Sequence, residues 1–189
     1  MSHLLRFTDV ACWRGGRLLF SDLSLSLGSG EGLWLRGPNG VGKSSALRLA
    51  AGLLRPLGGV IEAAPAALAD EALALDRELP LVRALAFWSP AGGAAKLEFV
   101  LEALDLARLA EVPVRLLSTG QARRARLARV AASDARLWLL DEPLSGLDHV
   151  SIALVTALLD RHRSVGGAVL LTSHQPLPSQ GWRTLDIAA

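Results

Sequence analysis

A glycine-rich stretch near the start of the chain has the residue types and spacing of a phosphate-binding loop. It matches G-x-x-x-x-G-K-[ST] at every fixed position, and its members are Gly37, Pro38, Asn39, Gly40, Val41, Gly42, Lys43 and Ser44. Glycines allow the backbone to curl so that successive N–H groups point at phosphate oxygens. The ammonium of Lys43 can reach the β- and γ-phosphates, and the hydroxyl of Ser44 can coordinate Mg²⁺. We therefore expect this loop, continued by Ser45, to bind ATP, with Lys43 taking part in catalysis.

Two acidic residues follow an apolar run later in the chain. Residues 137–140 are predicted to form a buried strand, which delivers Asp141 and Glu142 at its carboxyl end. In a fold built around a phosphate loop, that end of the strand lies beside the loop. Asp141 can then hold Mg²⁺ through water, and Glu142 can polarise the attacking water as general base. A solvated acidic turn is the alternative, and the complete phosphate loop argues against it.

The sequence also predicts the elements that position these groups. A short strand over residues 33–35 precedes the phosphate loop, and a helix from Lys43 to about Ala51 follows it and stops at Gly52. Farther along, helices and strands alternate, over residues 119–132, 137–140, 149–163 and 168–171. Strands that alternate with helices favour a mainly parallel α/β sheet.

Two other regions differ from this alternation. Leucines alternate with serines over residues 23–27, which predicts a half-buried strand in an added antiparallel portion. Residues 72–116 are rich in Ala and Leu, and three prolines break them into short helices. A stripe at helical spacing predicts core packing there, formed by Leu97, Val100, Leu101 and Leu104. We expect one domain over residues 1–189, with a helical subdomain at roughly 72–132.

The overall composition is that of a globular protein. The chain has 189 residues, about half of them apolar, and a formal net charge of +2. Its one cysteine, Cys12, is expected to be buried and leaves no partner for an internal disulfide, which fits a reducing cytoplasm. No apolar run approaches the ~20 residues needed to span a bilayer. These features argue against a disordered chain and against a disulfide-rich secreted domain.

A third segment with chemical potential precedes an arginine-rich helix. Ser118 is well placed to cap that helix, and the amides of Thr119 and Gly120 then form a second anion-binding terminus. An ordinary capped helix is the alternative. The phosphate loop and this helix start are two phosphate-binding sites in one chain, and they cannot both bind a single nucleotide.

This segment also carries a family resemblance. Residues 117–121 read L-S-T-G-Q and resemble the L-S-G-G-Q signature of ABC transporter ATP-binding subunits, as does the R-R-A-R-L-A-R run at 123–129. Residues 145–148 resemble the D-loop of that family, and residues 172–174 resemble its switch-histidine segment. The resemblance covers essentially the whole chain. It implies the ABC type of P-loop NTPase fold and an ATP hydrolase that is coupled to transport.

The resemblance assigns further residues to the site. It implies a head-to-tail homodimer in which one subunit covers the ATP of the other with Ser118, Thr119, Gly120, Gln121 and the D-loop residue Asp148. His174 would touch the γ-phosphate and take part in catalysis, and Trp13 would stack on adenine. A structural histidine and a hydrophobic edge residue are the alternatives for these two. Four arginines at 123, 124, 126 and 129 are expected to form a solvated or interfacial face, so we expect no nucleic-acid partner.

One departure from the family concerns the metal site. The family normally has a glutamine that follows a strand beyond the phosphate loop and contacts both Mg²⁺ and the transmembrane partner. No glutamine stands between Ser44 and Gln121. Asp70 and Glu71 fill that place, and we expect Glu71 to reach Mg²⁺. Either the coupling is unusual or hydrolysis is weakened. Thr119, in place of the first signature glycine, is a milder departure.

Several local strings narrow the resemblance. Residues 12–20, 33–40, 47–56 and 117–124 resemble those of the haem exporter ATP-binding subunits of cytochrome c maturation. This implies a peripheral protein on the cytoplasmic face of a bacterial inner membrane, which works with membrane-embedded subunits to power haem release or export. Another ABC transporter ATPase, a non-transport ABC ATPase and a nucleotide-binding regulator with little turnover are the alternatives.

Overall fold

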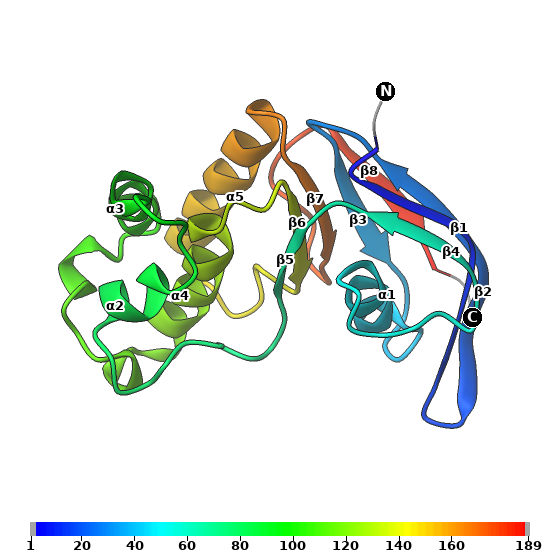
Figure 1. Cartoon of the computed structure of the whole chain (residues 1–189), viewed down its shortest axis with the longest axis horizontal. Helices are drawn as coiled ribbons and strands as arrows, with labels where there is room; N and C mark the ends of the chain where they lie inside the picture. The colour runs from blue at the N-terminus through cyan, green and yellow to red at the C-terminus, as the bar shows by residue number, and fades with distance from the viewer. Residues whose placement is uncertain (1–2, 188–189) are drawn as a thin grey trace.

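An antiparallel sheet forms one side of the protein, whose computed structural model describes residues 3–187. Its strands lie in the order β2 (Arg17–Leu27), β1 (Leu5–Arg14) and β4 (Gly58–Ala63). The leucines of residues 23–27 are buried between more exposed serines, which confirms the predicted strand. Gly15 and Gly16 join β1 to β2, and both have positive φ, a conformation that glycine adopts without steric cost. The hairpin projects beyond the sheet (Figure 1), and Arg17 at the start of β2 contacts Gly40 of the phosphate loop.

A five-stranded sheet forms the centre, and all its neighbouring strands are parallel. Its order is β5 (Ala66–Ala69), β6 (Leu137–Asp141), β7 (Ala168–Thr172), β3 (Gly32–Arg36) and β8 (Trp182–Asp186). Strands β6 and β7 are apolar almost throughout because both faces of the sheet are covered. The predicted α/β class with an antiparallel portion is thus confirmed.

Helices cover the two faces of this sheet. Helix α1 (Lys43–Ala50) lies between the two sheets, where it packs with Leu137 and Leu139 of β6 (Figure 1). The opposite face, with Trp138 and Leu140, packs against α4 (Thr119–Ala132) and α5 (His149–Ser164). The same core continues beyond α4 to the short elements α2 (Leu81–Ala86), α3 (Ala94–Ala103), η1 (Ala107–Leu109) and η2 (Val114–Leu116). Successive residues of one strand therefore supply two different cores.

Most predicted elements stand where the sequence places them. Helix α1 ends one residue before the expected Ala51, and Gly52, at φ +71°, closes it as predicted. The stripe of residues 97–104 is buried in the core, and so is Cys12. Strands β4 and β8 have no counterpart in the sequence prediction, because both are largely exposed and lack an apolar alternation. The division into a helical subdomain at 72–132 stays a proposal.

His162 on α5 makes the stability of this fold pH-dependent. Its ring stacks on Trp138 with centroids 3.7 Å apart, and its Nε2 lies 3.1 Å from the carbonyl oxygen of Arg136. Burial lowers the pKa of His162 from 6.5 to about 4. The unfolded chain therefore takes up this proton first as the pH falls. The contribution of neutral His162 is fully present above about pH 6.5 and is lost as the pH falls toward 4, by about 1–2 kcal/mol after allowance for solvent.

Urea unfolding at pH 7.5 and pH 5 measures this loss. We expect His162→Phe, which keeps a ring on Trp138 but carries no proton, to lose less stability than the wild type between these two pH values. Equal losses in both proteins would show that His162 does not contribute to the acid sensitivity.

Candidate active site

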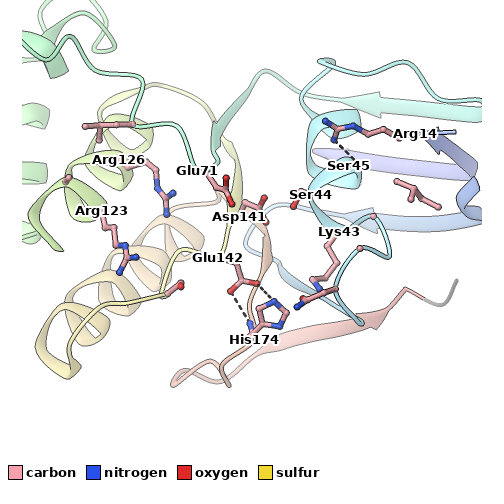
Figure 2. A pocket seen from close by; sticks show the side chains of 18 of the residues that line it. Arg14, Lys43, Ser44, Ser45, Glu71, Arg123, Arg126, Asp141, Glu142 and His174 are labelled. Atoms are coloured by element: carbon pink, nitrogen blue, oxygen red, sulfur yellow. Dashed lines mark hydrogen bonds and ion pairs between the residues drawn. The ribbon is translucent and has the colours of Figure 1, made fainter. Parts of the chain in front are cut away.

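A cleft of about 1010 Å³ opens at the carboxyl ends of β6 and β7, between the phosphate loop and the start of α4 (Figure 2). Most sequence-predicted site residues line it. They are Asn39, Gly40, Gly42, Lys43, Ser44, Ser45, Glu71, Thr119, Asp141, Glu142 and His174. The lining also includes residues that the sequence did not single out for this site, among them Arg14, Arg17, Arg123, Arg126 and Ser145.

The phosphate loop encloses the ammonium of Lys43. Lys43 Nζ donates hydrogen bonds to the carbonyl oxygens of Gly37 at 2.8 Å and Pro38 at 3.1 Å. Helix α1 begins at Lys43, so its free backbone N–H groups point into the cleft. Gly42, at φ +112°, turns the chain into this helix, and a β-carbon there would lie 2.9 Å from the ring of Phe20. The loop therefore has the shape and the donors that a polyphosphate requires.

The two carboxylates after β6 differ in their surroundings. Asp141 Oδ1 accepts a hydrogen bond from the buried hydroxyl of Thr172 at 2.7 Å, and that hydroxyl in turn accepts one from the backbone N–H of Glu142 at 3.1 Å. Thr172 on β7 thus fixes both acidic residues, a role that no motif around Thr172 had indicated. Glu142 is held at φ +49°, a conformation that a non-glycine residue adopts only when its surroundings impose it.

Glu142 and His174 lie against each other across the end of the sheet. Glu142 Oε2 accepts a hydrogen bond from the backbone N–H of His174 at 3.1 Å, and Oε1 lies 3.5 Å from His174 Nε2. Among the residues described, Glu142 Oε1 is buried without a hydrogen-bond partner. One oxygen of this carboxylate is therefore fixed by a backbone hydrogen bond, whereas the other makes only the 3.5 Å contact with the His174 ring. A buried acceptor with no partner is costly to a fold, which points to a role in chemistry.

The oxygen ligands in the cleft suit a magnesium ion. Ser44, Asp141 and Glu71 all line it, and they offer a hydroxyl and two carboxylates. Within residues 3–187 no cluster of three or more His, Cys, Asp or Glu side chains forms a metal cage. Mg²⁺ commonly binds through one or two carboxylates together with substrate phosphates and water. The residues present therefore fit Mg²⁺ bound together with a nucleotide.

Two arginines of the β1–β2 hairpin reach the phosphate loop. Arg17 Nη2 donates to the carbonyl oxygen of Gly40 at 2.9 Å, and Arg14 Nη1 donates to Ser45 Oγ at 3.4 Å (Figure 2). In the sequence, the only indication of these two contacts is that Arg14 and Arg17 flank the turn at Gly15 and Gly16. In total, five basic side chains and three carboxylates line the cleft. This excess of positive charge favours a polyanionic ligand.

The start of α4 has the capping box that its sequence indicates. Ser118 Oγ accepts from the backbone N–H of Gln121 at 3.3 Å, and Gln121 Oε1 accepts from the N–H of Ser118 at 2.8 Å. Asp148 caps α5 without a reciprocal bond: its side chain accepts a hydrogen bond from the N–H of Ser151, and this bond lowers the pKa of Asp148. Eight expected ligands are absent from the cleft lining within residues 3–187, namely Gly37, Pro38, Val41, Ser118, Gly120, Gln121, Asp148 and Trp13. Trp13 lies on β1, and 57% of its surface is exposed.

The expectation of a solvated or interfacial arginine face on α4 is wrong for Arg129 and Arg124, and only in part for Arg126, which is half-buried and lines the cleft. Arg129 is only 7% exposed and donates to the carbonyl oxygen of Leu68. Arg126 donates to the carbonyl oxygen of Asp70 at 2.6 Å, and Arg124 to that of Leu104 at 2.7 Å. The guanidinium groups fold inward because they can satisfy backbone carbonyls at the ends of neighbouring elements. Burial lowers the pKa of both Arg126 and Arg129.

Comparison with known proteins agrees with this geometry. The family model described as "ABC transporter" matches residues 20–145. The chain therefore belongs to the ABC transporter family. A solved structure described as "Structure of ATP binding subunit of ABC transporter" has the same fold, with a TM-score of 0.83, 24% identity and coverage of 90% of this chain and 79% of that one.

Within the family, the chain is similar over nearly its whole length to proteins of cytochrome c biogenesis. It is 54% identical over 178 residues to the "Cytochrome c biogenesis ATP-binding export protein CcmA" of Sphingopyxis alaskensis, covering 92% of this chain and 91% of that protein. It is 50% identical over 183 residues to the protein of the same name from Zymomonas mobilis, covering 95% and 82%. The resemblance drawn from the sequence is thus confirmed. No helix within residues 3–187 combines the length and apolarity that crossing a membrane requires.

Proposed function

We propose that the chain is the ATP-hydrolysing subunit of an ABC transporter of cytochrome c biogenesis, which powers haem release or export. The observation that carries the hydrolytic part is the cleft itself, where a phosphate loop faces the Glu142 carboxylate, one oxygen of which has no hydrogen-bond partner among the described residues. The names of the relatives support the biological role, since they describe ATP-binding export proteins of cytochrome c biogenesis.

The residues of the cleft have distinct roles in the proposed reaction. The ammonium of Lys43 exchanges its bonds to the loop carbonyls for bonds to the β- and γ-phosphates. Glu142 accepts a proton from water as the water oxygen forms a bond to the γ-phosphorus and the bond to the β–γ bridging oxygen breaks. His174 holds Glu142 in place and reaches the γ-phosphate. Ser44 and Asp141, with Glu71 nearby, would hold Mg²⁺, and the ion would offset the charge of the phosphate oxygens.

A head-to-tail homodimer would complete this site. The capped start of α4 presents N–H groups to solvent, and most of the signature residues do not line the chain's own cleft. We infer that these groups grip the nucleotide bound to a second copy, with Ser118, Thr119, Gly120, Gln121 and Asp148 at the contact. Trp13 lies exposed next to Arg14, and we assign it to stacking on adenine.

The proposed location is the cytoplasmic face of a bacterial inner membrane, on membrane-embedded subunits of cytochrome c maturation. Affinity purification of the tagged chain from detergent-solubilised membranes tests this assignment, with the bound proteins identified by mass spectrometry. We expect cytochrome c maturation subunits to copurify and the complex to hydrolyse ATP only when Mg²⁺ is present. Recovery of permease subunits from another transporter would overturn the biological role. ATP binding without turnover would instead indicate a nucleotide-binding regulator. The specific reason to consider this alternative is that Glu71 stands in place of the usual glutamine.

A further inference from the structure

Three arginines connect other helices to the end of β5, next to the cleft. From α4, Arg129 donates to the carbonyl oxygen of Leu68 and Arg126 donates to that of Asp70 at 2.6 Å. From α1, Arg48 Nη2 lies 3.4 Å from Asp70 Oδ2, while Asp70 Oδ1 accepts a bond from the N–H of Ala72. The turn after β5 is therefore held from both sides.

The two acidic residues in this turn differ in how their charges are compensated. Asp70 is partly buried and pairs with Arg48. Glu71 is exposed and lines the cleft, and within residues 3–187 it has no ion-pair partner within 4.0 Å. Near it, a bound triphosphate would meet a negative charge that no ion pair within the described chain offsets. Like charges that share a site repel one another strongly unless a positive group lies close by.

Arg126 is the guanidinium that the fold directs to this point. Figure 2 shows its side chain extending from α4 toward Glu71 and Asp141, and it lines the cleft with both of them. Only its Nη1 is committed to the carbonyl oxygen of Asp70, and in the described chain no acidic side chain lies within ion-pair distance of it. Its charge is therefore held at the cleft wall without being cancelled by a direct partner.

We propose that Arg126 is a positioning residue of the nucleotide site, whose bond to Asp70 fixes the turn and whose charge offsets Glu71 beside the triphosphate. This proposal rests on the ATPase function proposed above. The charge of Arg126 explains how the carboxylate of Glu71 can lie close to both Asp141 and a metal-bound nucleotide. It also gives the buried side of α4 a role in nucleotide binding within the same subunit.

A double-mutant cycle tests the proposal. Arg126→Gln removes the charge but keeps an N–H donor for the turn, and Glu71→Gln removes the opposing charge. We expect Arg126→Gln to raise the KM for MgATP about tenfold with little change in kcat, and Glu71→Gln to restore most of that loss when the two are combined. The defect should shrink in high salt, since the effect is electrostatic. Arg83→Gln, on the exposed face of α2, is the matched control and should behave as the wild type.

Several results would contradict the proposal while leaving the ATPase function intact. Additive effects with no rescue would show that Arg126 acts only through the backbone of Asp70. A normal KM in Arg126→Gln would show that its charge is not needed. Binding of a fluorescent ATP analogue gives the same comparison without turnover, and Arg126→Lys, which keeps the charge, should bind it nearly as well as the wild type. Failure of the wild-type complex to hydrolyse MgATP would instead refute the proposed function.

Discussion

Replacing Glu142 by glutamine is expected to abolish steady-state ATP hydrolysis, with kcat reduced at least a hundredfold. Glutamine has the shape of glutamate and keeps an oxygen that can accept the bond from the N–H of His174. What it loses is the second carboxylate oxygen, the proton acceptor of the proposed reaction, which among the described residues has no hydrogen-bond partner and only a 3.5 Å contact with His174 Nε2. ATP binding should therefore persist, and the bound ATP should hold two copies together as a dimer.

Two measurements check this prediction. Phosphate release gives the rate, and size-exclusion chromatography with light scattering gives the mass in the presence of MgATP. Glu98→Gln serves as the control, because Glu98 is an exposed glutamate on α3 outside the cleft. Hydrolysis at the wild-type rate by Glu142→Gln would mean that another group is the general base.

Loss of Lys43 should have the second large effect. Lys43→Ala removes the one ammonium enclosed by the phosphate loop, so we expect the affinity for ATP to fall about a hundredfold. The two loop carbonyls that it satisfies belong to half-buried Gly37 and exposed Pro38 and can bind water instead, so the fold should persist. Stabilisation by a ligand grows with the ratio of its concentration to Kd. Millimolar ATP should therefore raise the Tm of the wild type but leave that of Lys43→Ala nearly unchanged.

The chain supplies its own control, because Lys96 is its second and last lysine. Lys96 binds Asp134 and the carbonyl oxygen of Ser133, at the opposite end of β6 from the cleft. Lys96→Ala should lower the Tm without ATP slightly and leave the shift caused by ATP intact. An undiminished shift in Lys43→Ala would contradict the assignment of the loop as the triphosphate site.

The local motifs of the site were readable from the sequence because each depends on a short stretch of backbone. The phosphate loop needs glycines at set positions followed by a helix, and that helix begins at the predicted Lys43. Residues 137–140 are apolar because both faces of β6 are covered, so their burial and the acids at their end were foreseeable. Ser118 and Gln121 stand three residues apart, which is the spacing of a capping box.

The tertiary structure alone decided which side chains from distant elements meet. Thr172 reaches Asp141 only because β6 and β7 are neighbours in register. The run of arginines in α4 has the composition of an exposed face, yet Arg126 and Arg129 bind carbonyls near the end of β5, more than fifty residues earlier in the chain. The sequence shows only that long basic side chains are present in this helix. Their direction depends on which unsatisfied backbone groups lie within reach, and these are set by long-range packing.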